Sequence, residues 1–138
     1  MRRRAVLSGL ATLPAVLLAG CAADDPPGGG LAAQPVHVVF FEDDSLAVPG
    51  AALAVIQDAA AIARRYPAAP VRVLGFVAPD PVHAPLGALS RARAEHVAAE
   101  LVRFGVPPAR IQVAGRGATA FADIPLESRR VEIHIGPA

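Results

Sequence analysis

The most restrictive feature of this chain is the order of its apolar patterns, because only two helical segments occur and each lies between strand-like runs. Residues 49–66 and 86–104 place apolar residues three and four positions apart, which is typical of amphipathic helices. The strand-like runs are residues 36–41, 71–77, 110–114 and 129–135. Two helices can cover only one face of a small sheet. The order therefore predicts an α/β fold, a two-layer α/β sandwich with β-α-β-α-β-β order and both helices on one face of a small mixed sheet.

Proline and glycine mark the predicted ends of the helices. Pro49 lies near the start of the first helix, and Pro67 stops it. Gly105 closes the second helix, and two prolines follow at residues 107–108. Residues 115–117 read Gly-Arg-Gly and are expected to form a turn after the third strand.

The chain opens with the features of a cleavable export signal. Three arginines at residues 2–4 precede an apolar stretch at residues 5–20. That stretch is shorter than the roughly 20 apolar residues that a membrane-spanning helix needs. We therefore expect residues 1–20 to be a signal peptide.

The end of this leader reads Leu-Ala-Gly-Cys at residues 18–21 and resembles the lipobox of bacterial lipoproteins. The resemblance implies that Cys21 is the lipid attachment site and that the chain is anchored to a membrane through its N-terminal lipid. Ala22 follows the cysteine, which by the same resemblance implies delivery to the outer membrane, with the domain in the periplasm. Cys21 is the only cysteine, so no intramolecular disulfide is possible.

A short linker is expected between the lipid and the folded domain. Residues 22–35 contain paired aspartates, paired prolines and three consecutive glycines, a composition that cannot bury a core. We therefore divide the chain into a signal peptide, the lipidated Cys21 with a flexible linker to residue 35, and one domain at residues 36–138.

Charge and aromatic content disfavour nucleic-acid binding. Three of the 13 basic residues lie in the leader, so acidic residues outnumber basic ones in the rest of the chain. The chain has one tyrosine, no tryptophan and no basic block after the leader. It therefore lacks both phosphate-neutralising charge and stacking aromatic side chains.

Four sequence blocks in the second half of the chain occur together. They are Leu-Ser-Arg-Ala-Arg-Ala at residues 89–94, Gly-Val-Pro-Pro-Ala-Arg-Ile at 105–111, Gly-Arg-Gly at 115–117 and Ser-Arg-Arg-Val-Glu-Ile at 128–133. Together they resemble the OmpA-like, or Pal-like, peptidoglycan-binding domain over approximately residues 36–135. The resemblance implies a non-enzymatic domain that binds peptidoglycan noncovalently and tethers the membrane to the wall.

In that family the ligand is the diaminopimelate of the stem peptide, which presents an ammonium beside a carboxylate. The family pairs an aspartate, in a Gly-His-Thr-Asp sequence, with the arginine of a Leu-Ser-x-x-Arg-Ala sequence. That arginine matches Arg93, whose planar guanidinium can hold a carboxylate through two parallel hydrogen bonds. Arg93 also falls on the apolar stripe of its helix, so its charge needs a partner. A structural role remains an alternative, either in an ion pair with a carboxylate or as a donor to nearby carbonyls.

The aspartate position departs from the family pattern. Ala78 stands there, preceded by Phe76 and Val77, and Leu86 replaces an asparagine that is usual in the family. A ligand ammonium left unpaired in a binding site costs about 2–5 kcal/mol.

Asp80 lies two residues beyond Ala78 and is the acid that could replace the missing aspartate. The alternative is that Asp80 is a solvated turn residue. We therefore expect the peptidoglycan-binding residues to be Arg93, Asp80, Ala78, Val77 and Leu86.

No pattern in the chain indicates catalysis, a cofactor or a metal. The four histidines show no ligand-like spacing, and the acids at residues 42–44 are not arranged as a calcium loop. We therefore expect a binding protein and not an enzyme. The first hypothesis is a peptidoglycan tether; the second is a degenerate OmpA-like domain that has lost this ligand and binds a protein partner in an envelope complex.

Overall fold

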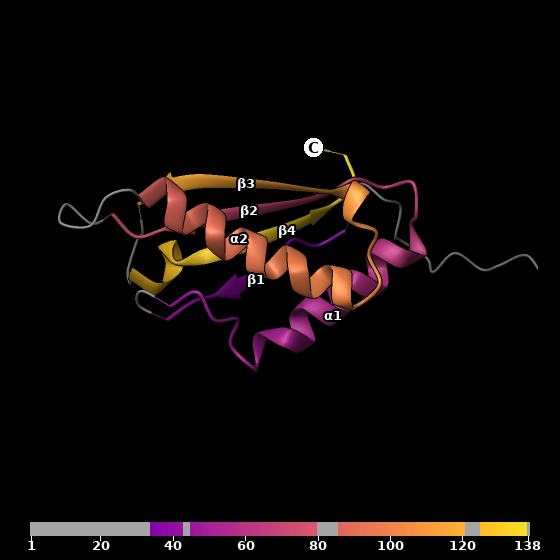
Figure 1. Cartoon of the computed structure of the whole chain (residues 1–138), viewed down its shortest axis with the longest axis horizontal. Coiled ribbons are helices and arrows are strands. Elements are labelled where there is room, and N and C mark those ends of the chain that lie inside the picture. Colours follow the sequence, from indigo (N-terminus) through magenta and orange to yellow (C-terminus); the bar gives the residue numbers. More distant parts are fainter. Residues whose placement is uncertain (1–33, 43–44, 80–85, 121–124, 138) are drawn as a thin grey trace, which may run out of the picture.

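The computed structural model describes residues 34–42, 45–79, 86–120 and 125–137. Within them, the chain forms the elements labelled in Figure 1: β1 (His37–Phe40), α1 (Ala52–Arg65), β2 (Val71–Val77), α2 (Leu86–Arg103), β3 (Ile111–Ala118) and β4 (Arg130–Ile135). Two short 3-10 helices, η2 (Pro108–Arg110) and η3 (Pro125–Ser128), precede β3 and β4. The predicted β-α-β-α-β-β order is confirmed.

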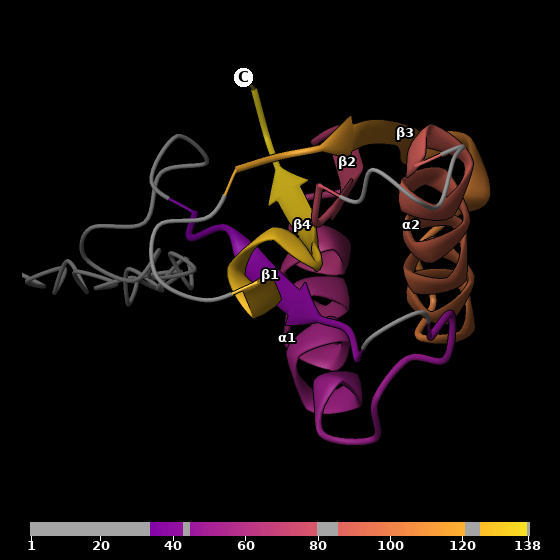
Figure 2. The ribbon, with the colours of Figure 1, turned by 90° about the vertical axis from the view of Figure 1, so that its left-hand side faces the viewer.

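The four strands form one mixed sheet in the order β1-β4-β2-β3. β4 runs antiparallel to both β1 and β2, whereas β2 and β3 are parallel. Figure 2 shows both helices on the same side of this sheet. The expectation of a two-layer α/β fold is therefore confirmed.

The core lies between the helices and the covered face of the sheet. Alternate residues of β2 and β4 point into it, so Val73 and Ile133 are fully buried. Ile56 of α1 and Leu101 of α2 meet them from the helix layer. Among the described residues, the buried members of this cluster fall between Val39 and Ile135.

The third strand is longer than the sequence predicts. The expectation that residues 115–117 form a turn is wrong, because β3 continues through them to Ala118. Parallel pairing with β2 persists through Gly75↔Gly115 and, after a register shift, Val77↔Ala118. Gly117 accommodates the irregularity with a positive φ of 73°, which a glycine adopts without strain.

Arg110 closes the end of α1 from across the fold. Its guanidinium donates hydrogen bonds to the carbonyl oxygens of Ala63, Tyr66 and Ala69 at 2.7–3.1 Å. These carbonyls lie in the last turn of α1 and just beyond it, where a helix has no backbone donors of its own to offer. One arginine therefore satisfies three acceptors and places a cation at the negative end of the helix dipole.

The closest contact between α2 and the sheet is built on two glycines and a serine. A Cβ atom at Gly75 would collide with the carbonyl oxygen of Ser90, and one at Gly115 would lie 2.7 Å from the Ser90 hydroxyl. That hydroxyl is buried, donates to the Gly87 carbonyl at 2.9 Å and accepts from the Gly117 amide at 3.0 Å. The serine of the Leu-Ser block therefore holds the first turns of α2 against β2 and β3.

In the part of the chain that the structure describes, neither helix is both long and apolar enough to span a membrane.

We expect Gly75→Ala to destabilise the fold by about 3 kcal/mol or more, since the new methyl group would meet backbone that cannot move without shifting α2. Gly87→Ala is the matched control, because nothing lies within 4 Å of a Cβ there and alanine favours a helix. Urea unfolding of both variants measures the difference. Equal stabilities would show that the helix does not depend on this close approach.

Candidate functional site

Arg93 is buried in the contact between α2 and the turn that follows β1. Its side chain is 1% exposed, and its guanidinium carbon lies 5.2 Å from the centroid of the Phe41 ring. Nε donates to the Ser45 carbonyl oxygen at 2.9 Å, and Nη2 donates to the Glu42 carbonyl oxygen at 3.1 Å. The arginine therefore fixes the chain after β1 onto α2.

These hydrogen bonds agree with the prediction from the sequence that the buried charge of Arg93 needs a partner. Of the two structural alternatives, the described contacts correspond to donation to nearby carbonyls. The other arginines of α2 behave differently: Arg91 pairs with Glu95 at 2.8 Å and Arg103 with Glu100 at 2.8 Å, and all but Glu100 of these side chains are more than half exposed. Arg93 is thus the one buried cation among the arginines of α2.

The remaining predicted site residues lie around the connection from β2 to α2. Ala78 directly follows β2 and is half-buried, and Leu86 is the half-buried first residue of α2. Val77 is 1% exposed and faces the core, while its carbonyl accepts a hydrogen bond from the Thr119 amide at 3.0 Å. Asp80 and Cys21 lie outside the described residues.

A second cluster on the sheet was not anticipated from the sequence. The guanidinium of Arg130 stacks on the Phe76 ring, 4.4 Å from its centroid. Its Nε donates to Glu132 at 2.7 Å, and its Nη1 donates to the Glu127 carbonyl at 2.7 Å. The alternation of β4 was the available signal, because it places Arg130 and Glu132 on the same face, opposite the core.

Glu132 lies between the side chains of Arg130 and His134. It lies 3.0 Å from His134 Nε2 as well as 2.7 Å from Arg130 Nε. Burial alone would raise the pKa of this carboxyl, but the hydrogen bonds and charges of Arg130 and His134 outweigh it and lower the pKa below its usual 4.5. The ionised form is therefore stabilised in the folded chain.

For His37, the effect of burial on the pKa outweighs the effects of its neighbours. Its partial burial lowers its pKa below the usual 6.5, and the opposing effects of Asp58 and of the Pro35 backbone do not cancel this.

Among the described residues, no three His, Cys, Asp or Glu side chains gather closely enough to hold a metal ion.

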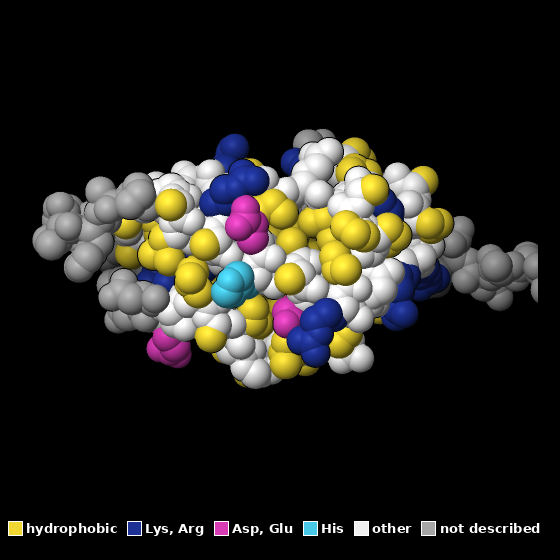
Figure 3. Space-filling model, in the orientation of Figure 1, with side chains coloured by type: hydrophobic (Ala, Val, Ile, Leu, Met, Phe, Trp, Pro, Cys, Tyr) yellow, Lys and Arg dark blue, Asp and Glu magenta, His cyan; other side chains and the backbone are white. Residues whose placement is uncertain are grey.

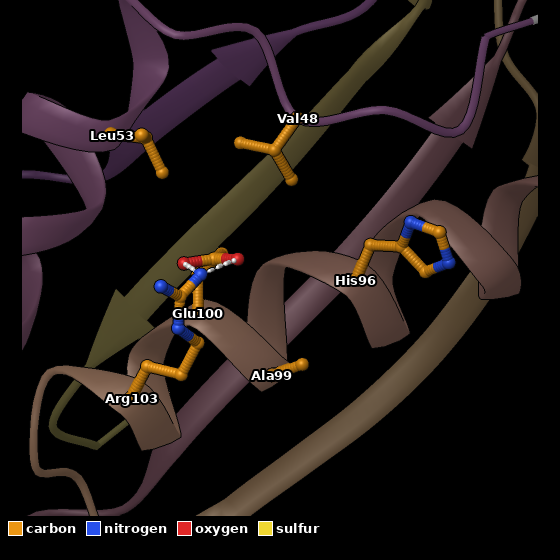
Figure 4. A pocket seen from close by; sticks show the side chains of 6 residues that line it. All are labelled: Val48, Leu53, His96, Ala99, Glu100 and Arg103. Atoms are coloured by element: carbon orange, nitrogen blue, oxygen red, sulfur yellow. Dashed lines mark hydrogen bonds and ion pairs between the residues drawn. The ribbon is translucent and has the colours of Figure 1, made fainter.

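Two hollows flank α2 on the helix-covered side, whose surface appears in Figure 3 as hydrophobic groups interspersed with charged ones. The first, of about 390 Å³, lies between Val48 and Leu53 on one side and α2 on the other. Figure 4 shows the paired Glu100 and Arg103 in its wall. The second, of about 300 Å³, is lined by apolar residues of α2 and β3 and by Glu95. The lining of neither includes Arg93, Ala78 or Leu86.

The comparison with protein families agrees with this arrangement. The model of the OmpA family matches residues 40–128, which include β1's last residue, both helices and the Arg93 region. The chain belongs to the OmpA family. Membership of this family agrees with the expectation of a binding protein and not an enzyme.

Solved structures confirm the fold of this OmpA-family chain. The peptidoglycan-associated lipoprotein from Burkholderia pseudomallei is 22% identical, with 81% of this chain and 97% of that one covered at a TM-score of 0.65. The C-terminal domain of Helicobacter pylori MotB is 24% identical, with coverage of 76% and 86% and a TM-score of 0.66. The OmpA-like domain of FopA1 from Francisella tularensis is 18% identical, with coverage of 74% and 72% and a TM-score of 0.64. No curated protein matches the chain.

Truncation of Arg93 is expected to weaken the fold itself. Arg93→Ala removes the charged donor of the hydrogen bonds to the Ser45 and Glu42 carbonyls and the stacking on Phe41, so the free energy of unfolding should fall by about 2–4 kcal/mol. Arg91→Ala is the control on the same helix, and its exposed ion pair is worth less than about 1 kcal/mol. Urea unfolding measures both; an Arg93→Ala variant as stable as Arg91→Ala would remove the structural role.

The lowered pKa of Glu132 predicts an acid-dependent loss of stability. Because the folded-state pKa lies below the unfolded value of about 4.5, the contribution of Glu132 is fully present above that value. It is lost as the pH falls through the folded-state pKa. Glu132→Gln should therefore flatten the stability curve below about pH 4.5. Unfolding midpoints measured through this window test it, and identical slopes for both proteins would contradict it.

Proposed function

We propose that this chain is an outer-membrane lipoprotein whose OmpA-family domain, in the periplasm, binds peptidoglycan noncovalently. The export signal and the Leu-Ala-Gly-Cys sequence support lipid attachment at Cys21. Family membership and structural similarity to a peptidoglycan-associated lipoprotein support the wall as the ligand. The chain would then hold the membrane to the wall without performing chemistry on either.

The observation that carries the proposal is the way Arg93 is held. Phe41 and the carbonyls of Glu42 and Ser45 fix its guanidinium in one orientation, so little conformational entropy remains to be lost on binding. A carboxylate is a stronger acceptor than a carbonyl. In our proposal the ligand carboxylate takes the place of the Glu42 carbonyl, which makes the longer of the two contacts at 3.1 Å.

The other residues have separate roles in this proposal. Ala78 and Leu86 border the ligand, and Val77 supports that border from the core because its side chain is buried. Asp80 supplies the negative charge for the ammonium of diaminopimelate in place of the missing aspartate.

A second function is favoured by two observations. Ala78 provides no charge for an ammonium, and Arg93 is 1% exposed and bound to backbone carbonyls. Both fit a domain that keeps the family fold but binds a protein partner of the envelope. The two functions differ in whether purified peptidoglycan alone retains the domain.

Retention on purified peptidoglycan, with free diaminopimelate as competitor, is the direct test. Ala78→Asp restores an acid at the family position and should strengthen retention tenfold or more, because it pairs the ligand ammonium. Ala88→Asp is the control, since it adds the same charge at an exposed position of α2.

The outcomes separate the two functions. Retention that diaminopimelate abolishes, and that Ala78→Asp alone strengthens, supports the wall-binding proposal. A folded domain that peptidoglycan does not retain contradicts that proposal and favours the protein-binding function.

A further inference from the structure

We infer that the sheet face opposite the helices is a membrane-docking surface, which lies on the anionic phospholipid layer that holds the lipid anchor. This inference rests on the proposed attachment at Cys21. We call this surface the open face and define it by Val36, Phe40, Arg72, Leu74, Phe76 and Arg130.

Strand register places five of these residues on one side of the sheet, and Val36 immediately precedes β1. Val131, Ile133 and Ile135 point into the core, so Arg130 points to the opposite side. Arg130 is directly paired with Phe40 of β1, and paired residues share a face. In β2, the buried alternation of Val71, Val73 and Val77 leaves Arg72, Leu74 and Phe76 on that same open side. Both helices cover the other side (Figure 2).

The exposed apolar groups of this face are concentrated at one edge. Four large hydrophobic side chains are markedly exposed among the described residues, and two of them, Val36 at 46% and Phe40 at 44%, lie on or beside β1. β1 is an edge strand, so these groups project beside the open face without a neighbouring strand to cover them. Half-exposed apolar side chains at an edge can enter the outer part of a lipid layer.

The charges of the open face suit an anionic surface. Arg130 is paired with Glu132 on this face, whereas Arg72 forms no ion pair within the described part of the chain, so Arg72 offers a positive charge to an anionic surface. Arg130 already lies flat on Phe76, and an arginine can extend its charge to a headgroup while its stem covers apolar surface. Each arginine near an anionic leaflet contributes an attraction that salt weakens.

The anchor would enter the domain beside this face. The linker predicted from the sequence ends at residue 35, and β1 begins at His37, immediately after the exposed Val36. A linker of residues 22–35 can extend to about 50 Å at most. Tethering at that length gives a local concentration in the millimolar range, so even a weak surface affinity keeps the open face on the membrane.

This placement fixes the orientation of the domain. With the open face on the membrane, the helix layer lies on the side directed away from it (Figure 2), and Arg93 belongs to α2 of that layer. Arg93 would then lie in the layer nearer the wall without any rotation about the linker.

Flotation with phospholipid vesicles tests the inference. The protein is the chain from residue 21 with Cys21→Ser, so that neither leader nor lipid contributes, and the whole described core is retained. We expect measurable binding to vesicles rich in phosphatidylglycerol, several-fold weaker binding to phosphatidylcholine vesicles, and release by high salt. Phe40→Ser and Arg72→Ala should each reduce the partition coefficient about fivefold.

Val102→Ser and Arg103→Ala are the matched controls, because Val102 is 39% exposed and Arg103 is exposed, both on α2. They should leave vesicle binding unchanged. Absence of binding to anionic vesicles, or equal losses in the controls, would overturn the inference. So would loss of peptidoglycan retention in Phe40→Ser with vesicle binding intact, because the face would then serve the wall. Peptidoglycan retention of the parent chain is measured separately, so failure of the proposed wall binding is distinguishable.

Discussion

The contact of Ser90 with Gly75 and Gly115 determines where the rest of the structure lies. Because neither glycine carries a Cβ, the backbone of α2 reaches van der Waals distance of β2 and β3, and the serine hydroxyl links the helix to Gly117. α2 in turn carries Arg93, which holds the turn after β1. Displacement of α2 would therefore disturb three parts of the molecule together: the end of β3, the first turns of α2 and the candidate site.

Because Arg93 helps to hold the fold together, its presence is not specific evidence for ligand binding. A residue that is buried and holds two segments of the fold is retained whether or not the domain still binds a ligand. The burial of Arg93 is consequently compatible with both proposed functions. Position 78 is more informative, because it lies just beyond β2, is half-buried and does not belong to the buried core cluster. The residue type at such a position can be determined by ligand binding, because the packing of the core does not also determine it.

The sequence predicted the elements well because each has a local signal. Apolar periodicity and the flanking prolines and glycines located α1, α2 and β2, and the bounds of β2 agree with the structure. The end of β3 was predicted wrongly, because Gly-Arg-Gly reads locally as a turn, whereas pairing with β2 keeps it in the sheet. That pairing is a long-range property and leaves no trace in the local pattern.

The site was predictable only in part for the same reason. The stripe of α2 predicted that Arg93 is buried and needs partners, but the described hydrogen bonds go to backbone carbonyls of residues about fifty positions away. The three acceptors of Arg110 lie 41 to 47 positions away in the chain. Backbone carbonyls occur at every residue, so no sequence pattern marks the ones that a given arginine will find. Side-chain identity shows that a charge must be satisfied, whereas only the fold shows where.

A two-layer fold leaves one face of its sheet without a covering layer. In this chain, the apolar side chains of that face are shielded at the centre of the sheet but exposed at one edge. At its centre, Arg130 covers the Phe76 ring and is itself held by Glu132, so apolar surface there is shielded by a charged group. At the β1 edge, Phe40 and Val36 have no such cover. Uncovered apolar groups on an edge strand favour unwanted association between chains, which proteins usually prevent with charged or bulged edges. Phe40 and Val36 lie next to the point where the linker enters the domain, and a lipid surface that covers them would explain why they are exposed in the isolated domain. The lipid anchor would hold this edge at the membrane and so keep it from pairing with other chains.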